Sequence, residues 1–171
     1  MTTFPVLTTD RLILRAPGAA DTYAMLGFLA SDHAKFYGGP MNADAAWHKF
    51  SAYVGQWTLR GYGFFAITLR DSGNTIGMAG PHHPDHFPEP EMSWLLTSDE
   101  HESKGYASEA CRAVLSHLFT DLGWTTCVSY VDRANTASRI LAERLGATLD
   151  TDSPALISGC DTYRHTAEAV A

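Results

Sequence analysis

The most constraining feature of this sequence is a regular apolar stripe between residues 107 and 122. Its members follow spacings of 3, 1, 3, 1, 3 and 4 residues: Ala107, Ala110, Cys111, Val114, Leu115, Leu118 and Leu122. These intervals predict an amphipathic helix with one buried face, and Gly123 suits its C-terminal end. A helix of this kind is one element of a larger alternating pattern.

The rest of the chain alternates between helical spacing and short β-rich runs. We expect strands at 12–15, 64–69, 75–79, 91–97, 124–131 and 160–166, and further helices at 21–37, 43–60 and 137–145. The proline-rich segment 81–90 should have no regular structure. Asp21 resembles an N-cap, and Trp47 and Trp57 should both lie in the core. The resulting order, βααβββαβαβ, predicts an α/β or α+β domain with a mixed sheet.

Size and composition limit the class of protein. At 171 residues, with 45% hydrophobic and 18% charged residues, the chain should form a single domain, 1–171, with its core at about 7–166. No apolar run could span a bilayer, and the N-terminus lacks the pattern of a secretory signal, so we expect a cytoplasmic protein without a membrane partner. Cys111, Cys127 and Cys160 are expected to be reduced core thiols.

The net charge of −7 argues against nucleic acid as a partner, because binding to a phosphate backbone needs clustered Lys and Arg. The same charge suits a cationic acceptor such as an amine.

A candidate anion site lies at 102–108, where a loop with Gly105 leads into the helix described above. The first N–H groups of a helix and its dipole point at the same place, and a glycine lets the backbone approach a ligand closely. Lys104 and Ser108 could add a charge and a hydroxyl donor. The alternative is a capped core helix after a turn. Neither a P-loop nor a dinucleotide-binding glycine pattern is present, which disfavours those nucleotides.

Four segments in this order resemble the GNAT acetyltransferases, and among them the group related to ribosomal-protein N-terminal acetyltransferases. The segments are 7–15 (LTTDRLILR), 90–95 (PEMSWL), 104–110 (KGYASEA) and 131–138 (VDRANTAS) leading to 145–147 (LGA). The resemblance covers the chain from Leu7 to about Thr166. It implies a mostly antiparallel central sheet with helices on both faces, and dimerisation is common among similar proteins, so a homodimer stays an open expectation.

The resemblance also implies an acetyl-CoA site between the fourth and fifth strands. The diphosphate would bind the backbone of a loop whose members are Ser103, Lys104, Gly105, Tyr106, Ala107 and Ser108. The pantetheine arm would pair with the strand at Leu95, Leu96 and Thr97, and Asn135 matches the position that usually hydrogen-bonds this arm. The family's loop starts with Gln or Arg where this chain has Glu102, which removes a donor beside the diphosphate.

Acetyl transfer to an amine needs a base, a donor for the carbonyl oxygen and a proton for the leaving thiolate. The resemblance makes Glu91, at the start of the strand beside the expected thioester, the candidate base, acting directly or through water; the alternative is a solvent-facing Glu. Ser138 matches a serine that can protonate the thiolate, and the alternative is a small residue in a first helical turn. The carbonyl donor would be a backbone N–H near Leu95.

Many members carry a tyrosine seven residues after the Asn, where this chain has Ala142. Ser138, Tyr130, Tyr106 or water must then supply the proton.

The segment His82-His83-Pro84-Asp85-His86 could bind zinc or copper, but a proline-rich loop fixes no ligand geometry, so we expect no metal and regard these residues as part of the acceptor rim. Phe36 and Tyr37 are either core or cleft residues.

The sequence thus predicts transfer of acetyl from acetyl-CoA to a primary amine of a small molecule or a protein N-terminus. The alternative is an acyl-CoA-binding domain without turnover.

Overall fold

The computed structural model describes residues 4–153 and 156–170, so the ends of the predicted domain 1–171 and residues 154–155 lie outside the described part. The strands are β1 (Leu7–Thr8), β2 (Leu12–Arg15), β3 (Phe65–Leu69), β4 (Thr75–His82), β5 (Glu91–Leu96), β6 (Thr126–Asp132), β7 (Thr148–Leu149) and β8 (Cys160–Thr166). The α-helices are α1 (Thr22–Leu29), α2 (Ala43–Arg60), α3 (Tyr106–Ser116), α4 (Thr136–Arg144) and α5 (Ala167–Val170). Short 3-10 helices are η1 (Ala19–Asp21), η2 (Asp32–Tyr37) and η3 (Asp99–His101), and a π-helix, η4 (His117–Asp121), continues α3.

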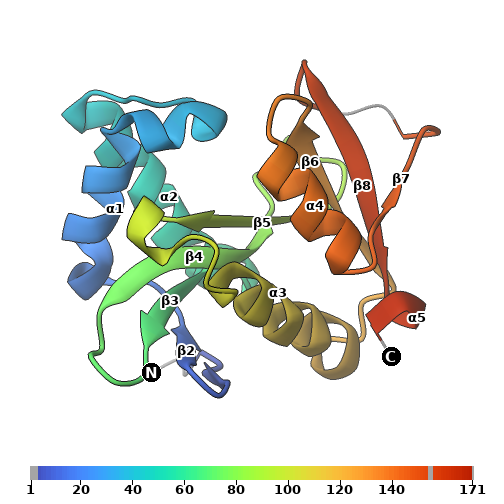
Figure 1. The fold of residues 1–171 in the computed structure, drawn as a ribbon, viewed down its shortest axis with the longest axis horizontal. Coiled ribbons are helices and arrows are strands. Elements are labelled where there is room, and N and C mark those ends of the chain that lie inside the picture. The colour runs from blue at the N-terminus through green and yellow to red at the C-terminus, as the bar shows by residue number, and fades with distance from the viewer. Residues whose placement is uncertain (1–3, 154–155, 171) are drawn as a thin grey trace.

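The strands form one sheet in the order β1-β2-β3-β4-β5-β6-β8-β7. All neighbouring pairs are antiparallel except β5 and β6, which are parallel. Figure 1 shows α1 and α2 on one side of the molecule and β6, α4, β8 and β7 on the other, with β5 between them. The predicted mixed, mostly antiparallel sheet is therefore confirmed, and β1 and β7 are short additions to the predicted order.

Helices cover both faces of this sheet, as predicted, and each face has its own core. The stripe of α3, including Ala110, Val114 and Leu115, packs against one face with Leu12 and Ile67. A second cluster of buried residues packs α1 and α2 against the other face: Met25, Phe28, Leu29, Phe50, Tyr53, Phe64, Met78 and Leu95. The alternation predicted along β5 is confirmed, since its side chains divide between these two cores.

The feature that positions the functional site is the separation of β5 from β6. These strands pair at a single position, Glu91 with Val128, and then diverge along their length. The gap lies at the centre of the sheet, where α3 begins on one side and α4 on the other (Figure 1). Parallel strands that diverge leave backbone groups and side chains facing an opening instead of a neighbour.

The structure gives the detail of two predicted helix starts, after Asn42 and after Asp21. Asn42 caps α2 by accepting a hydrogen bond from the Ala45 N–H at 2.9 Å. Asp21 precedes α1 as predicted, but its buried carboxylate makes no cap hydrogen bond. It accepts two hydrogen bonds of 2.9 Å from Arg15 and one of 2.5 Å from Thr75, so it ties β2 and β4 to the start of α1.

Two predictions are wrong. Trp47 is 54% exposed, whereas Trp57 on the same helix is 2% exposed, because the buried stripe of α2 runs through Ala46, Phe50, Tyr53 and Trp57 and Trp47 lies outside it. Pro81 and His82 were expected in a loop but end β4, opposite Met92 and Glu91. The pairing of β3 with β4 stops at Ala79, so no β3 hydrogen bond is lost where Pro81 lacks an N–H.

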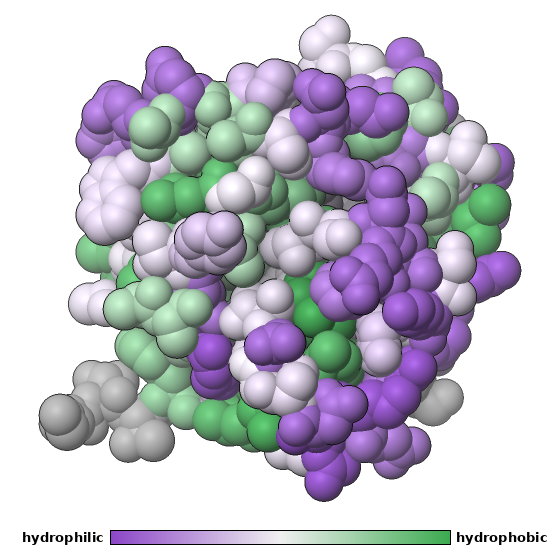
Figure 2. Space-filling view, turned by 60° about the vertical axis from the view of Figure 1, so that its left-hand side comes forward, coloured by the Kyte–Doolittle hydropathy of each residue, from purple (hydrophilic) through white to green (hydrophobic). Residues whose placement is uncertain are grey.

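The three cysteines are buried free thiols, as predicted. Among the described residues, no helix is long and apolar enough to cross a membrane. In the view of Figure 2, hydrophilic residues gather along the right-hand side, while apolar residues reach the surface elsewhere on the same face. Hydrophilic and apolar residues are thus unevenly distributed over the surface seen in this view.

Candidate active site

Two cavities meet at the gap between β5 and β6. The first cavity has a volume of about 440 Å³ and lies beside Glu91 and α2. The second cavity has a volume of about 580 Å³ and lies beside Leu95, Leu96 and the start of α3. Residues that line both cavities mark their junction: Lys35, Phe36, Tyr37, Trp94, Asn135 and Ser138. The volumes are those of small-molecule sites, and a ligand in one cavity can meet a ligand in the other at the junction.

Glu91 is the buried carboxyl of the first cavity. It opens β5 and is 7% exposed, so the predicted alternative of a solvent-facing glutamate is excluded. Burial raises the pKa of Glu91 to about 8, although the Tyr130 N–H and the charge of Lys49 oppose this effect. A carboxyl with a pKa near neutrality can exchange a proton with a ligand at physiological pH.

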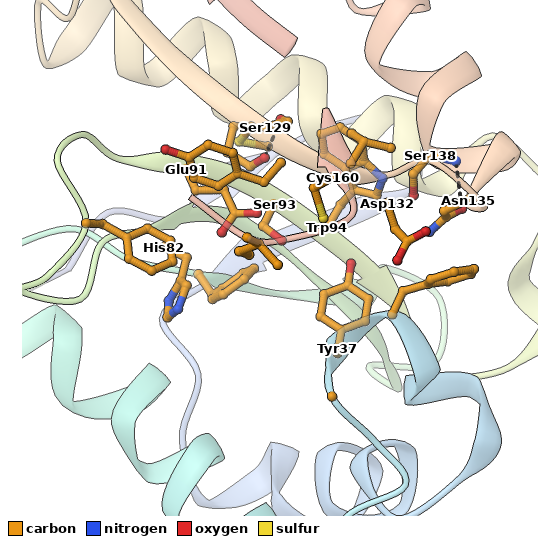
Figure 3. Close-up of a pocket in the computed structure, with 18 of the residues that line it drawn as sticks. Tyr37, His82, Glu91, Ser93, Trp94, Ser129, Asp132, Asn135, Ser138 and Cys160 are labelled. Carbon is orange, nitrogen blue, oxygen red and sulfur yellow. Dashed lines mark hydrogen bonds between the residues drawn. The ribbon is translucent and has the colours of Figure 1, made fainter. Parts of the chain in front are cut away.

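Tyr37 stands at the junction, and the sequence patterns did not single it out for chemistry. It ends η2, its backbone carbonyl accepts a hydrogen bond of 2.7 Å from the Lys49 ammonium, and its ring packs edge-on against Phe28 at 5.7 Å. Figure 3 shows its hydroxyl pointing into the cavity, facing β5. Burial, with a smaller effect of Glu91, raises the pKa of Tyr37, so the hydroxyl stays protonated and can donate a hydrogen bond.

Asn135 and Ser138 form the opposite wall of the junction. The Asn135 side chain accepts a hydrogen bond of 3.1 Å from the Ser138 N–H and thereby caps α4. In Figure 3 both residues lie at the far end of the cavity from His82, beyond Tyr37. The capping role engages the Asn135 carbonyl oxygen, and the residue lines both cavities.

The position of the expected tyrosine, Ala142, is fully buried in the core on α4 and lines neither cavity. Of the other proposed proton donors, Tyr130 lines the first cavity and Ser138 lines both. The ring of Tyr106 carries the Arg11 guanidinium at 4.5 Å and faces neither cavity. Tyr37 and Ser138 are therefore the hydroxyls that the fold brings to the junction.

The loop before α3 has the backbone of an anion site. Ser103 and Gly105 have left-handed backbone, with φ of 58° and 80°, a conformation found in concave arrangements of N–H groups. Gly105 precedes α3, and among the described residues no side chain caps this helix end. Its first N–H groups are thus open to a phosphate.

Arg11, which precedes β2, holds this loop. Its guanidinium donates a hydrogen bond of 2.9 Å to the Lys104 carbonyl and forms an ion pair of 2.7 Å with Glu109 on α3. The Arg11 N–H and the Thr9 hydroxyl also donate to Glu109, at 2.9 and 2.6 Å. Residues of the 7–15 motif therefore contact the loop before α3 and Glu109 on α3, and spacing in the sequence does not reveal these contacts.

The predicted cofactor residues divide into two groups. Leu95, Leu96, Ser103, Ala107 and Asn135 line the second cavity. The others lie outside its lining, and their predicted contacts could be made only at its mouth or through the backbone: Thr97, Lys104, Gly105, Tyr106 and Ser108.

Thr97 follows β5, and both its N–H and its hydroxyl donate to the Ile76 carbonyl, at 2.9 and 3.1 Å. Its backbone N–H is therefore already engaged by β4. Glu102 is exposed at the mouth of the second cavity, where it adds negative charge beside the loop.

The histidine segment contributes to the first cavity through one residue. His82 lines this cavity and packs edge-on against Tyr53 at 5.4 Å, and burial lowers its pKa to about 4. His83 faces the Tyr62 hydroxyl at 2.6 Å. In the part of the chain that the structure describes, the group with metal-ligand spacing is a different one, His33, Asp99 and Glu102, all exposed.

Ser129 on β6 lines the first cavity next to a histidine but is not an activated nucleophile. Its single hydroxyl proton goes to the Met92 carbonyl, so the His165 Nε2, 2.9 Å away, must donate to Ser129 and not accept from it. Burial lowers the pKa of His165 to about 4, which keeps this ring neutral. Ser129 instead satisfies a β5 carbonyl at the point where β6 turns away.

Comparison with known proteins decides the family. The family model described as "Acetyltransferase (GNAT) domain" matches residues 11–148. The chain belongs to the GNAT acetyltransferases. An uncharacterised N-acetyltransferase of Bacillus subtilis (strain 168) is 29% identical over 147 residues, covering 84% of this chain and 82% of the relative. The predicted family and the predicted class of enzyme are both confirmed.

Solved structures agree with this assignment. An acetyltransferase from Agrobacterium tumefaciens (strain C58) is 38% identical, with a TM-score of 0.89 and 96% coverage of both chains. A ribosomal L7/L12 α-N-protein acetyltransferase solved in complex with coenzyme A has the same fold, at 15% identity, a TM-score of 0.72, and coverage of 96% of this chain and 99% of the other. The GNAT fold uses acetyl-CoA, so this protein is an acetyltransferase with acetyl-CoA as donor.

Proposed function

We propose that this GNAT protein transfers an acetyl group directly from acetyl-CoA to a primary amine, which belongs to a small molecule or a protein N-terminus. The observation that carries the proposal is the junction of the two cavities beside a buried carboxyl with a pKa near neutrality. The second cavity, with the open start of α3 at its mouth, suits the cofactor. The first cavity, which contains Glu91, suits the amine.

In this proposal Glu91 takes the proton that the amine loses. An amine attacks only when its nitrogen has a free lone pair, and a base within the cavity supplies that form. The acetyl-CoA thioester supplies the acetyl group and a thiolate leaving group. The Tyr37 and Ser138 hydroxyls approach the junction from opposite walls and can donate a proton to the departing sulfur.

The residues present fit acetyl-CoA. The uncapped start of α3 and the left-handed backbone of Ser103 and Gly105 suit a diphosphate, and Leu95 and Leu96 suit the pantetheine arm. Lys104 lies in the same loop and adds a positive charge. Glu102 opposes this charge, so we expect the cofactor to bind less tightly than it would with a neutral residue there.

The test is to mix the purified protein with acetyl-CoA and a panel of primary amines, and to follow free thiol while calorimetry measures binding of coenzyme A. We expect thiol release that depends on the amine, and acetylated product by mass spectrometry. Binding of coenzyme A without transfer to any amine in the panel would contradict the proposal. Size-exclusion chromatography with light scattering would in the same preparation test the expected homodimer.

A further inference from the structure

The first cavity contains a half-buried cation without a counterion. Lys49, on α2, lines the cavity, and its ammonium donates one hydrogen bond of 2.7 Å, to the Tyr37 carbonyl. Within residues 4–153 and 156–170, no carboxylate lies at ion-pair distance from it. An ammonium has three donors, so two of them and the charge remain for a ligand. Burying such a charge without a partner is costly, which favours a ligand that brings an anion.

The neighbouring groups do not neutralise Lys49. Glu91 is close enough for its charge to act on the pKa of Lys49, but its own pKa of about 8 leaves it largely protonated at neutral pH. The Asp132 carboxylate, on β6, accepts a hydrogen bond of 2.8 Å from the Ala134 N–H. Lys35 adds a second positive charge at the junction, and His82 is neutral because burial lowers its pKa to about 4. The α2 wall of the cavity therefore carries the positive charge of Lys49, while the Asp132 carboxylate lies across the cavity on β6.

The remaining walls of the first cavity are largely aromatic. The contributing rings are Phe36, Tyr37, Tyr53, Phe64, Phe87 and Trp94. Aromatic faces pack well against apolar or aromatic ligands, and a cavity of about 440 Å³ has the size of a small-molecule site. One small molecule can carry all three features: an apolar or aromatic body, an amine for Glu91 and an anion for Lys49.

We propose that the acceptor is a free α-amino acid with an apolar or aromatic side chain, whose carboxylate binds Lys49 while its amine lies against Glu91. The inference rests on the proposed function, because it assumes that the amine is acetylated in this cavity. In the reaction, the amine nitrogen forms a bond to the acetyl carbon and the carbon–sulfur bond breaks. The proton from nitrogen passes to the ionised form of Glu91, a minor fraction at neutral pH that grows as the pH rises towards the pKa of about 8, and the sulfur receives a proton from Tyr37 or Ser138.

The experiment compares matched acceptors with the full chain and acetyl-CoA. Each apolar or aromatic amino acid is assayed beside its C-terminal amide, which keeps the side chain and the amine but lacks the carboxylate, and beside tripeptides that begin with the same residue. For the native protein we expect kcat/KM for the free acid to exceed that for the amide by about tenfold or more, as for one partner of a partly buried charge pair. Faster turnover of amides or tripeptides than of the free acids would overturn the inference.

Substitution of Lys49 tests the assigned contact. Lys49→Met keeps the aliphatic stem without the charge, and we expect it to raise KM for the free acid by about tenfold and to abolish the preference over the amide, with kcat nearly unchanged. Lys49→Arg should retain the preference in part. His48, the exposed neighbour on the same helix, provides the control His48→Gln, which should leave both acceptors unaffected.

The outcomes separate the inference from the proposed function. If amines are acetylated but the acid has no advantage, and Lys49→Met changes no preference, the inference is wrong and acetyl transfer stands. If no amine in the panel is acetylated although coenzyme A binds, the proposed function fails first. Should Lys49→Met fail to fold, the comparison of acid and amide in the native protein still decides the matter.

Discussion

Replacing Glu91 by glutamine should remove a pH-dependent loss of stability, because the buried carboxyl of Glu91 destabilises the folded state when it ionises. Glutamine has nearly the same shape but cannot ionise. Burial raises the pKa of Glu91 from 4.5 to about 8. At about 1.36 kcal/mol per pH unit, this difference corresponds to roughly 5 kcal/mol in the free energy of unfolding, an upper value because buried sites relax when they ionise.

The sign follows from the direction of the pKa change. The folded state holds the Glu91 proton more tightly than the unfolded state, so the stabilisation is complete below about pH 4.5, the unfolded pKa, and is lost as the pH rises through about 8. In acid, the free energy of unfolding of Glu91→Gln should therefore differ little from that of the native protein. As the pH rises, the native protein should lose stability through ionisation of Glu91, whereas Glu91→Gln should not, so the variant becomes the more stable of the two.

The assay is denaturant unfolding from about pH 5 to about pH 9, with Glu100→Gln at an exposed site as the matched control. We expect the unfolding free energies of the native protein and Glu91→Gln to diverge with pH, and those of the native protein and Glu100→Gln to stay parallel. In acetyl transfer, kcat/KM of the native protein should rise with pH around 8, and Glu91→Gln should lower it by about 10²-fold to 10⁴-fold. Parallel curves of unfolding free energy against pH for Glu91→Gln and the native protein would show that folding does not raise the pKa of Glu91.

Three further substitutions test other parts of the site. Tyr37→Phe should lower kcat by about 10-fold to 100-fold with little change in KM for acetyl-CoA, because it removes a donor at the junction and keeps the ring; an unchanged kcat would leave Ser138 as the donor. Arg11→Met should raise KM for acetyl-CoA several-fold in steady-state assays, because it frees the Lys104 carbonyl and Glu109, and an unaffected KM would contradict the holding role. Glu102→Gln should tighten coenzyme A binding by calorimetry, by a margin that shrinks as salt is added, and weaker binding would argue against charge repulsion.

The sequence predicted the elements that have a clear period. The stripe of α3, the alternation along β5 and the glycines that end helices each depend on contacts close in the chain, and these elements formed as expected, except that Leu122, the last predicted member of the stripe, is 41% exposed. Trp47 shows the limit of this approach. Its spacing matches that of Trp57, but the packing of α2 against the sheet buries its neighbour Ala46 and leaves Trp47 exposed.

Site residues that belong to a sequence motif were predicted, whereas residues that only the packing of distant segments brings to the site were missed. Glu91 was identified by its place at the start of β5, but its burial depends on α2 and β6, which are distant in sequence. Tyr37 and Lys49 were not identified as functional residues, because the 3-10 helix η2 has no period and Lys49 reads as a surface residue of an amphipathic helix. The hydrogen bond from Lys49 to the Tyr37 carbonyl forms only when η2 and α2 pack together.

The central claim is that acetyl-CoA and an amine meet where the two cavities join. A crystal structure of the protein with coenzyme A and an acceptor amine tests it most directly. We expect the diphosphate on the backbone of residues 103–108, the sulfur between Tyr37 and Ser138, and the amine beside Glu91 in the first cavity. Coenzyme A bound outside the second cavity, or an acceptor nitrogen remote from Glu91, would contradict it.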